Sequence, residues 1–114
     1  MGLHHRMCHV LGGTFGLPHA ETHAVLLPHV VAFNAPAVPE AMERLGRAFG
    51  MVGPDAPMAL ARLNRQLGIV ETLRSLGLHD EDVERAAEEV VAKAYPNPRP
   101  ASAEDVRGIL RAAM

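Results

Sequence analysis

The stretch from residue 2 to residue 34 constrains this chain more than any other. It holds six of the seven histidines, at positions 4, 5, 9, 19, 23 and 29, and only two formally charged residues, Arg6 and Glu21. Histidine is the commonest side chain for metal ligation and for proton transfer near neutral pH. Imidazoles this dense in an apolar, weakly charged segment therefore indicate a site rather than a solvated surface.

The spacing of these histidines predicts two helices that meet at a corner. Positions 5 and 9 are four residues apart, as are positions 19 and 23, so on a helix each pair projects from one face. Three glycines and a proline lie between the pairs, and these residues disfavour a continuous helix. We therefore expect helices over Leu3–Leu11 and His19–Phe33, joined by a tight loop that brings His5 near His19.

Two imidazoles that meet across such a corner form half of a metal site, because first-row metals usually take three or four ligands. We interpret His5, His9 and His19 as members of one site. His4 points about a quarter turn away from His5 on a helix, so we expect it outside this cluster.

Three further side chains have ordinary explanations. A histidine on an apolar helix face is more often a hydrogen-bonded core residue than a ligand, and we apply this interpretation to His29. We apply the same interpretation to His79, which follows Gly77-Leu78 in a predicted turn. Cys8 is the only cysteine and cannot form an internal disulfide, which fits a reducing cytosol. It is either a small buried hydrophobe, which we favour, or a thiolate ligand within the histidine cluster.

Length and composition bound the class of protein. A chain of 114 residues makes one small domain. It is 48% hydrophobic with no Trp, one Tyr and three Phe, which favours packed helices over a sheet. A formal net charge of −2 does not indicate the positive charge that binding to nucleic acid or to an anionic membrane requires. We see no signal peptide, and the best membrane segment, residues 24–33, is about half the spanning length, so a cytoplasmic location is expected.

The remainder of the chain predicts further helices with short connectors. One runs from Glu40 to Phe49 after a proline-containing connector, and one runs from a cap at Asp55 to Gly68. The apolar face of the second is predicted to be Met58, Leu60, Leu63 and Leu67, as part of the core. Residues 69–77 are expected to form a turn with at most a short helical piece.

Two helices are predicted near the C-terminus. The first begins at Asp80 or Asp82, and its inward positions are Val83, Ala86, Ala87, Val90 and Val91. Three prolines then exclude helix over residues 95–100. Ser102 and Asp105 resemble a capping box, and the helix after them has Val106, Ile109, Leu110 and Ala113 on its core side. The predicted fold is all-α, an irregular bundle of about six helices without a convincing strand.

The residues of the first stretch carry a resemblance to a known family. GLHHRMCHVLGG…LPHAETHAVLLPHVVAFN resembles the C-terminal helical domain of the iron-containing (group III) alcohol dehydrogenases, and HHRMCHVLGGTFGLPHAETH is most similar to the maleylacetate reductases among them. LRSLG at 73–77, NPRP at 97–100 and EDV at 104–106 agree in the same order. The resemblance implies that residues 1–114 form part of the helical domain of the dehydroquinate synthase-like, iron-type alcohol dehydrogenase fold.

The resemblance implies roles for the histidines that match the family pattern G-x-x-H-x-x-x-H-x-x-G followed by a proline and a histidine. His5 and His19 fall at two metal-ligand positions, for Fe²⁺ or Zn²⁺. His9 falls beside the nicotinamide and the substrate, as a candidate catalytic proton relay. In such enzymes NAD(P)H delivers a hydride while the protein positions the reactants.

The resemblance also implies a substrate. Glu21 and His23 belong to the HAETH variant and are expected to help hold a dicarboxylate, with Arg6 as a further candidate through charge-assisted hydrogen bonds. The implied reaction is the reduction of maleylacetate to 3-oxoadipate in the breakdown of aromatic compounds. No P-loop or GxGxxG motif occurs in the chain. The family's N-terminal nucleotide-binding domain and its remaining metal ligands have no counterpart in these residues. We therefore expect that the chain alone does not catalyse the reduction.

Three hypotheses follow from these expectations. The first is the C-terminal part of a maleylacetate reductase that needs its missing N-terminal domain. The second is a fragment of another iron-containing alcohol dehydrogenase, against which HAETH argues. The third is a non-catalytic helical module that binds a metal or a partner helix. Loss of the rest of the helical domain is expected to expose apolar surface on the first helices, which a homodimer partner could cover.

Overall fold

The computed structural model describes residues 2–48, 56–69, 71–93 and 95–114, and every regular element in these ranges is helical. The prediction of an all-α bundle is confirmed. A single turn of helix in the stretch expected to be mostly turn adds one element to the expected six. The elements are α1 (Leu3–Gly13), α2 (His19–Asn34), the 3₁₀ turn η1 (Ala35–Ala37), α3 (Pro39–Ala48), α4 (Ala56–Gln66), α5 (Leu73–Leu76), α6 (Asp82–Val91) and α7 (Ala103–Ala113).

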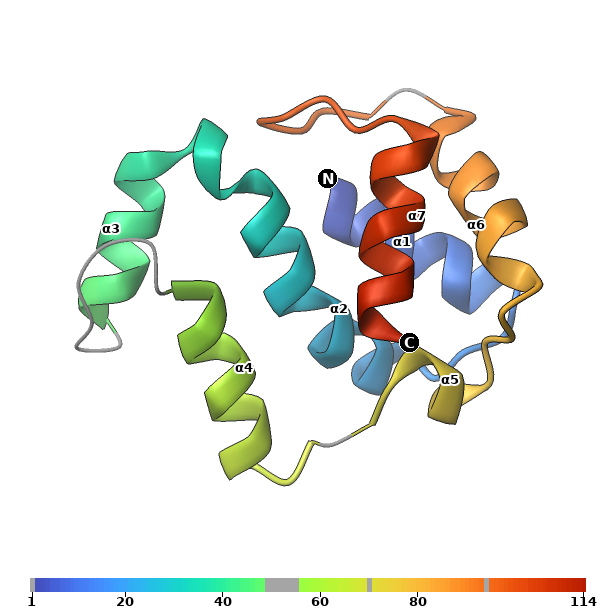
Figure 1. The fold of residues 1–114 in the computed structure, drawn as a ribbon, viewed down its shortest axis with the longest axis horizontal. Coiled ribbons are helices and arrows are strands. Elements are labelled where there is room, and N and C mark those ends of the chain that lie inside the picture. The colour runs from blue at the N-terminus through green and yellow to red at the C-terminus, as the bar shows by residue number, and fades with distance from the viewer. Residues whose placement is uncertain (1, 49–55, 70, 94) are drawn as a thin grey trace.

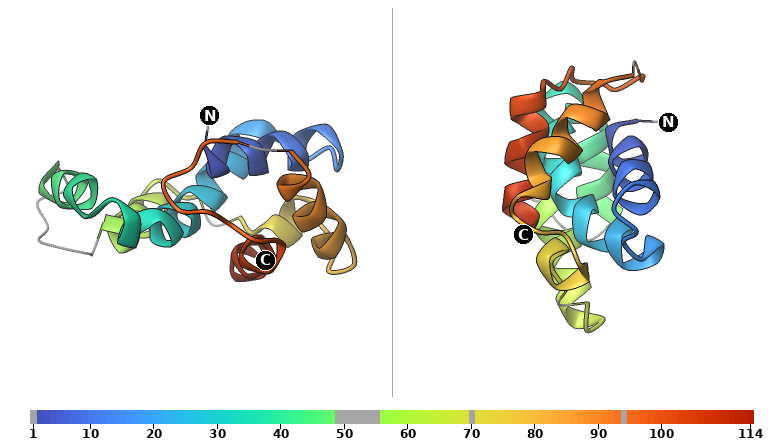
Figure 2. Two further views of the ribbon diagram at one scale, coloured as in Figure 1. Left: turned by 90° about the horizontal axis from the view of Figure 1, so that it is seen from above. Right: turned by 90° about the vertical axis from the view of Figure 1, so that its right-hand side faces the viewer.

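The helices form two groups that share α2. We call α1, α2, α5, α6 and α7 the body, and α3 with α4 the arm. In the body, α7 packs against α6 and α2, and α1 packs against α2 and α6 (Figure 1). The arm lies at the other side of α2, and Figure 2 shows α3 extending away from the body.

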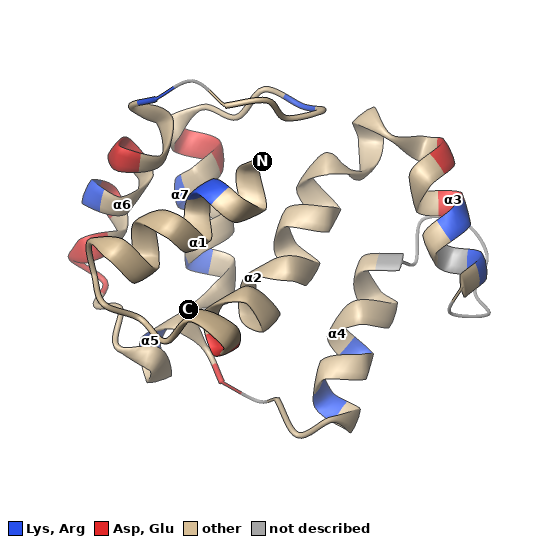
Figure 3. Ribbon diagram, turned by 180° about the vertical axis from the view of Figure 1, so that it is seen from behind, with Lys and Arg blue, Asp and Glu red and all other residues tan. Residues whose placement is uncertain are grey.

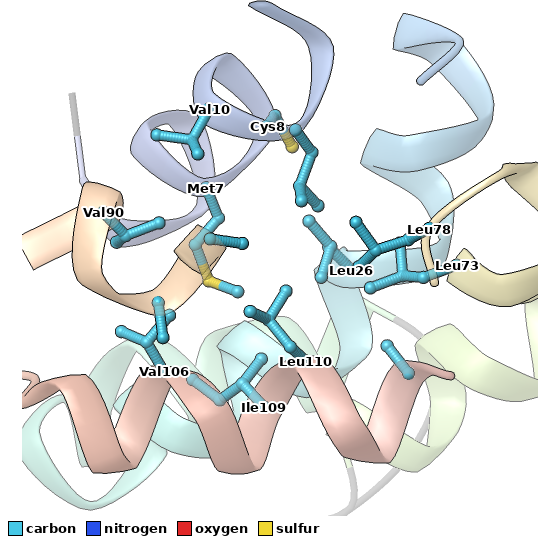
Figure 4. Close-up of a cluster of buried hydrophobic side chains, with 14 of the residues drawn as sticks. Met7, Cys8, Val10, Leu26, Leu73, Leu78, Val90, Val106, Ile109 and Leu110 are labelled. Carbon is cyan, nitrogen blue, oxygen red and sulfur yellow. The ribbon is translucent and has the colours of Figure 1, made fainter. Parts of the chain in front are cut away.

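The core lies in the body, where α1, α2, α6 and α7 meet (Figure 4). Leu11 and Leu26 are fully buried on the first two helices, and Leu110 is fully buried on the last. The predicted inward faces of α6 and α7 are confirmed, except that Val91 is only partly buried. The side chains of the core that are at most 1% exposed are Leu3, Met7, Leu11, Leu26, Leu73, Leu78, Ala86, Ala87, Val90, Val106 and Leu110.

Side-chain caps begin two of the body's helices. The predicted capping box of α7 is present: Asp105 N donates to Ser102 Oγ at 3.1 Å, and Ser102 N donates to Asp105 Oδ2 at 3.0 Å. Thr72 and Ser75 form the same reciprocal pair at the start of α5. These bonds satisfy N–H groups that the first turn of a helix leaves without partners. The box explains why so short a segment as α5 is helical.

The proline-rich tail is not helical, as predicted, and it ties the ends of α1 and α2 together. Asn97 Oδ1 accepts from Leu3 N at 3.1 Å, at the first turn of α1, and Asn97 Nδ2 donates to Asn34 Oδ1 at 2.7 Å. Arg99 donates to the Phe33 carbonyl at 3.0 Å and lies over the Phe33 ring. The NPRP segment is therefore a structural clamp on the first two helices.

The arm corrects one prediction about the core. Met58 and Leu67, predicted to be core residues, are 62% and 67% exposed. The side of α4 that meets α2 instead buries Ala59, and Asn64 Nδ2 donates to the Ala24 carbonyl at 2.8 Å. Helical periodicity gives the apolar positions of a helix, but a neighbouring helix decides which of them are covered. The predicted caps and turn over residues 49–55 lie outside the described residues.

Charged residues are distributed unevenly over the helices of both the body and the arm. Figure 3 shows charged positions gathered on α3, α6 and α7, while the ribbons of α1 and α2 are almost free of them. In the part of the chain that the structure describes, no helix is both long enough and apolar enough to cross a membrane. Of the large apolar side chains, Leu27 on α2 is also exposed, at 37%. The large apolar side chains that are exposed in the described residues are therefore Leu27 on α2, Met58 on α4 and Leu67 just after α4.

Candidate functional site

The corner between α1 and α2 forms as predicted. Gly16 has a φ of 70°, in the left-handed region that favours glycine. Pro18 precedes the first residue of α2 with extended backbone, φ −63° and ψ 132°. Leu17 N donates across the loop to the Leu11 carbonyl at 3.1 Å, and the Leu17 side chain is buried. The loop therefore holds the first turn of α2 beside the second half of α1.

A cavity of about 250 Å³ opens at this corner. Four histidines line it: His5 and His9 from α1, and His19 and His23 from α2. The structure thus brings together the three histidines that the sequence predicted as one site. Their roles as metal ligands and as a proton relay stay predictions. The complete lining is His5, Cys8, His9, Gly12, Gly13, Leu17, His19 and His23.

His4 does not line this cavity, as expected, and instead belongs to a second group of side chains beside it. Its Nε2 lies 3.3 Å from His23 Nδ1 and 3.7 Å from Cys8 Sγ. His4 and Cys8 are four residues apart on α1, so they share a face, and that face is turned toward α2. His4 therefore faces the α1–α2 interface, outside the cluster of His5, His9 and His19. The spacing of four residues to Cys8 was the sequence signal that could have indicated this second group. The three residues form a compact group, with one donor atom of each within 4.8 Å of the others.

Burial sets the protonation of this group. Desolvation, with the nearby His23 and His5, lowers the pKa of His4 to about 4. Burial, followed by the charges of His19 and His5, lowers the pKa of His23. Burial raises the pKa of the Cys8 thiol to about 12. At neutral pH the group is therefore two neutral imidazoles beside a thiol, which matches the expectation that Cys8 is a small buried residue.

The outer nitrogens of the two buried imidazoles have no protein partner. His4 Nδ1 and His23 Nε2 are inaccessible to solvent and make no hydrogen bond within the described residues. The His23 ring also lies 4.2 Å from the His19 ring, centroid to centroid, and 4.9 Å from the His4 ring. His23 therefore lies between His4 and the other histidines that line the cavity.

Arg6 and Glu21 take up positions that the sequence did not specify. Arg6 donates to the Glu89 carbonyl at 2.6 Å and to the Val90 carbonyl at 3.2 Å, at the last turn of α6. Basic side chains at this end of a helix satisfy carbonyls left without partners. Glu21 is exposed in the first turn of α2. Contacts of either residue with a substrate stay predictions.

Two other cavities flank the corner. One of about 430 Å³ is lined by Arg6, His9 and Lys93 among others, so His9 faces both this cavity and the one at the corner. The other, of about 480 Å³, lies between α2, α4 and α7 and includes His29. His29 is partly buried, and burial lowers its pKa, while the hydrogen bond expected for it stays a prediction. His79 lies in the turn before α6 but is exposed, so the interpretation of His79 as a core residue was wrong.

Comparison with known proteins identifies the family of this helical corner. The family model for the C-terminal region of the Fe-containing alcohol dehydrogenase family matches residues 1–114. The chain therefore belongs to the iron-containing alcohol dehydrogenase family and corresponds to its C-terminal helical region.

Within that family, the chain is similar to maleylacetate reductases. It is 47% identical over 114 residues to the maleylacetate reductase of Sphingobium indicum and 51% identical over 114 residues to maleylacetate reductase 2 of Cupriavidus pinatubonensis. These alignments cover 100% and 99% of this chain and 32% of each relative. The crystal structure of the maleylacetate reductase from Rhizobium sp. matches with a TM-score of 0.90 at 41% identity, over 99% of this chain and 31% of that one. The chain thus spans about a third of the length of the relatives that it matches.

The donor chemistry of the corner suits the metal that the family name implies. His5 and His19 line one cavity, and imidazole is a good ligand for iron and zinc. A complete site needs further ligands beyond this pair. The compact group of three donors in the described residues contains neither His5 nor His19. His5 and His19 therefore suit a metal at the corner as two of the ligands that a complete site would need.

Proposed function

We propose that this chain supplies the helical wall of the active site in an NAD(P)H-dependent reduction of maleylacetate to 3-oxoadipate. The observation that carries the proposal is the single cavity lined by His5, His9, His19 and His23. Identities of 47% and 51% to maleylacetate reductases, over at least 99% of the chain, support the choice of substrate.

The proposed roles follow the positions of the side chains. His5 and His19 would hold a divalent metal, which as a Lewis acid polarises a substrate oxygen when bound. His9 is the proton relay, because it is exposed and lies where the corner cavity and the flanking cavity meet. His23 and Glu21 would orient a carboxylate of the substrate. Arg6 would have to leave the α6 carbonyls to do so, and the proposal does not depend on it.

The hydride comes from NAD(P)H, and the 114 residues hold no glycine-rich phosphate loop for it. We propose that the nucleotide is held by a nucleotide-binding domain, in the same polypeptide or in a partner, that packs over the corner cavity. Closure of the cavity by that domain would exclude water from the histidines. The isolated 114 residues are then expected to oxidise no NAD(P)H with maleylacetate.

A domain exchange tests the proposal. This chain would replace the matching third of the Sphingobium indicum maleylacetate reductase, and NADH oxidation would be followed with maleylacetate. We expect an active hybrid, and we expect His9→Ala to lower its kcat by roughly 10²–10⁴-fold, the usual contribution of a positioned proton-transfer group. His79→Ala, at an exposed histidine in a distant turn, is the matched control. A folded hybrid that binds NADH but leaves maleylacetate unreduced would refute the proposal.

A further inference from the structure

The group of His4, Cys8 and His23, in which the cysteine is buried and the histidines are partly buried, has the composition of a soft metal site. Thiolate and imidazole together select zinc, copper(I) and similar ions over magnesium or calcium. One donor atom of each residue lies within 4.8 Å of the other two. The group shares no residue with the His5 and His19 pair, although its His23 is also a proposed contact for the substrate carboxylate.

The distances match the edges of a zinc coordination tetrahedron. With Zn–N near 2.05 Å and Zn–S near 2.3 Å, tetrahedral geometry separates two nitrogens by about 3.3 Å and a nitrogen from a sulfur by about 3.6 Å. His4 Nε2 and His23 Nδ1 are 3.3 Å apart, and His4 Nε2 is 3.7 Å from Cys8 Sγ. Two of the three edges therefore need almost no rearrangement.

The surroundings of the group also point to a ligand. His4 and Cys8 occupy one face of α1 at a spacing of four residues, and His23 meets them from α2, so the backbone of both helices fixes the donors. Cys8 and His23 line the corner cavity, which gives an ion a route of entry. The ring nitrogens that face the group are His4 Nε2 and His23 Nδ1, which lie 3.3 Å apart and can both reach one ion.

We propose that His4, Cys8 and His23 bind one Zn²⁺ ion between α1 and α2, with the fourth position directed to water or a ligand from the cavity. Binding replaces the thiol proton of Cys8 with the metal and leaves both imidazoles neutral. While the ion is bound, the His23 nitrogen that holds it is unavailable for a substrate carboxylate.

The test uses the purified 114-residue chain in reduced, metal-free form, titrated with Co²⁺ as a spectroscopic substitute and then with Zn²⁺. We expect one equivalent of Co²⁺ to produce thiolate-to-metal charge-transfer absorption, which Zn²⁺ then removes by displacement. Cys8→Ala and His4→Ala should each weaken binding by at least the roughly 10–100-fold that the loss of an outer-sphere partner costs. The exposed control His79→Ala should leave it unchanged.

X-ray absorption spectroscopy of the zinc-loaded wild-type chain identifies the zinc ligands directly. This measurement needs no variant, so it does not depend on whether the variants fold. We expect one sulfur at about 2.3 Å and nitrogen ligands at about 2.0 Å. The absence of a sulfur ligand, or of stoichiometric binding, would overturn the proposal. So would binding that survives Cys8→Ala but is lost in His5→Ala and His19→Ala. That last result would instead place the ion at the pair named in the proposed function, whereas an inactive domain exchange would leave this zinc site unaffected.

Discussion

Helices α6 and α7 of the body and helices α3 and α4 of the arm have similar amphipathic patterns, yet only the helices of the body are well packed. α6 and α7 bury their apolar stripes against α1 and α2. In the arm, the only described side chain that is buried is Ala59, at 5% exposure, while Met58 and Leu67 face solvent. An amphipathic stripe therefore predicts that a helix has an apolar face, but a second element must be present to cover it.

The two regions also differ in how they are joined to α2. Helices α1, α5 and α7 of the body contact α2 through buried apolar side chains. From α4, a single side-chain hydrogen bond among the described residues reaches α2. Pro28 explains that bond, because residue 28 has no N–H to donate to the Ala24 carbonyl four residues earlier. Asn64 Nδ2 donates to that carbonyl at 2.8 Å instead. A proline inside one helix thus creates the attachment point for another.

The largest expected contrast is between two leucines. Leu110→Ala, at a fully buried position of the body, should lower the free energy of unfolding by roughly 2–5 kcal/mol, because it leaves a cavity. Leu67→Ala, in the arm at 67% exposure, should change it by about 0.5 kcal/mol or less. Urea unfolding of both variants measures the difference. Equal losses would mean that the arm is as tightly packed as the body.

The cap of α7 tests whether the body unfolds as one unit. Ser102→Ala removes the acceptor for Asp105 N and should cost about 1 kcal/mol of stability. Ser102→Asp keeps an acceptor at the same position and should restore most of it. Since α7 packs on both α2 and α6, hydrogen exchange should accelerate in those helices together with α7. Acceleration confined to α7 would contradict a cooperative body.

The bond from Asn64 tests the attachment of the arm. Asn64→Ala should cost roughly 0.5–1.5 kcal/mol and accelerate amide exchange in α4 more than in α6 or α7. In a Pro28→Ala background, residue 28 regains an N–H for the Ala24 carbonyl, so the same substitution should cost less. A double-mutant cycle measures this coupling. An interaction energy of zero would contradict the role given to the proline.

The smallest expected effect concerns pH and His29, beside the cavity between α2, α4 and α7. Burial lowers its pKa from the ordinary 6.5, so the unfolded chain takes up the proton at a higher pH than the folded chain does. The stability contributed by neutral His29 is present above pH 6.5 and is lost as the pH falls below it. His29→Gln should therefore reduce the loss of stability on acidification. Urea midpoints across a pH series, with the exposed His79→Gln as control, measure the change, and identical slopes for His29→Gln and the wild type would refute it.

The local features of this protein could be read from its sequence. Glycine conformation and proline restriction placed the corner between α1 and α2, and Ser102 and Asp105 marked the start of α7. The cavity that His5, His9 and His19 share followed from the same corner together with a spacing of four residues. These features depend on contacts between residues that are close in the chain, so short-range physical rules suffice for them.

Tertiary packing decided the rest. Whether His4 faces solvent or Cys8 and His23 depends on the rotation of α1 against α2, and that rotation is set by the burial of residues such as Met7 and Leu110. The exposure of Met58 and Leu67 likewise depends on which elements are there to cover α4. The sequence by itself determined where helices begin, turn and end. Only the packed structure determined which of their faces meet, because burial is a property of neighbours that lie far apart in the chain.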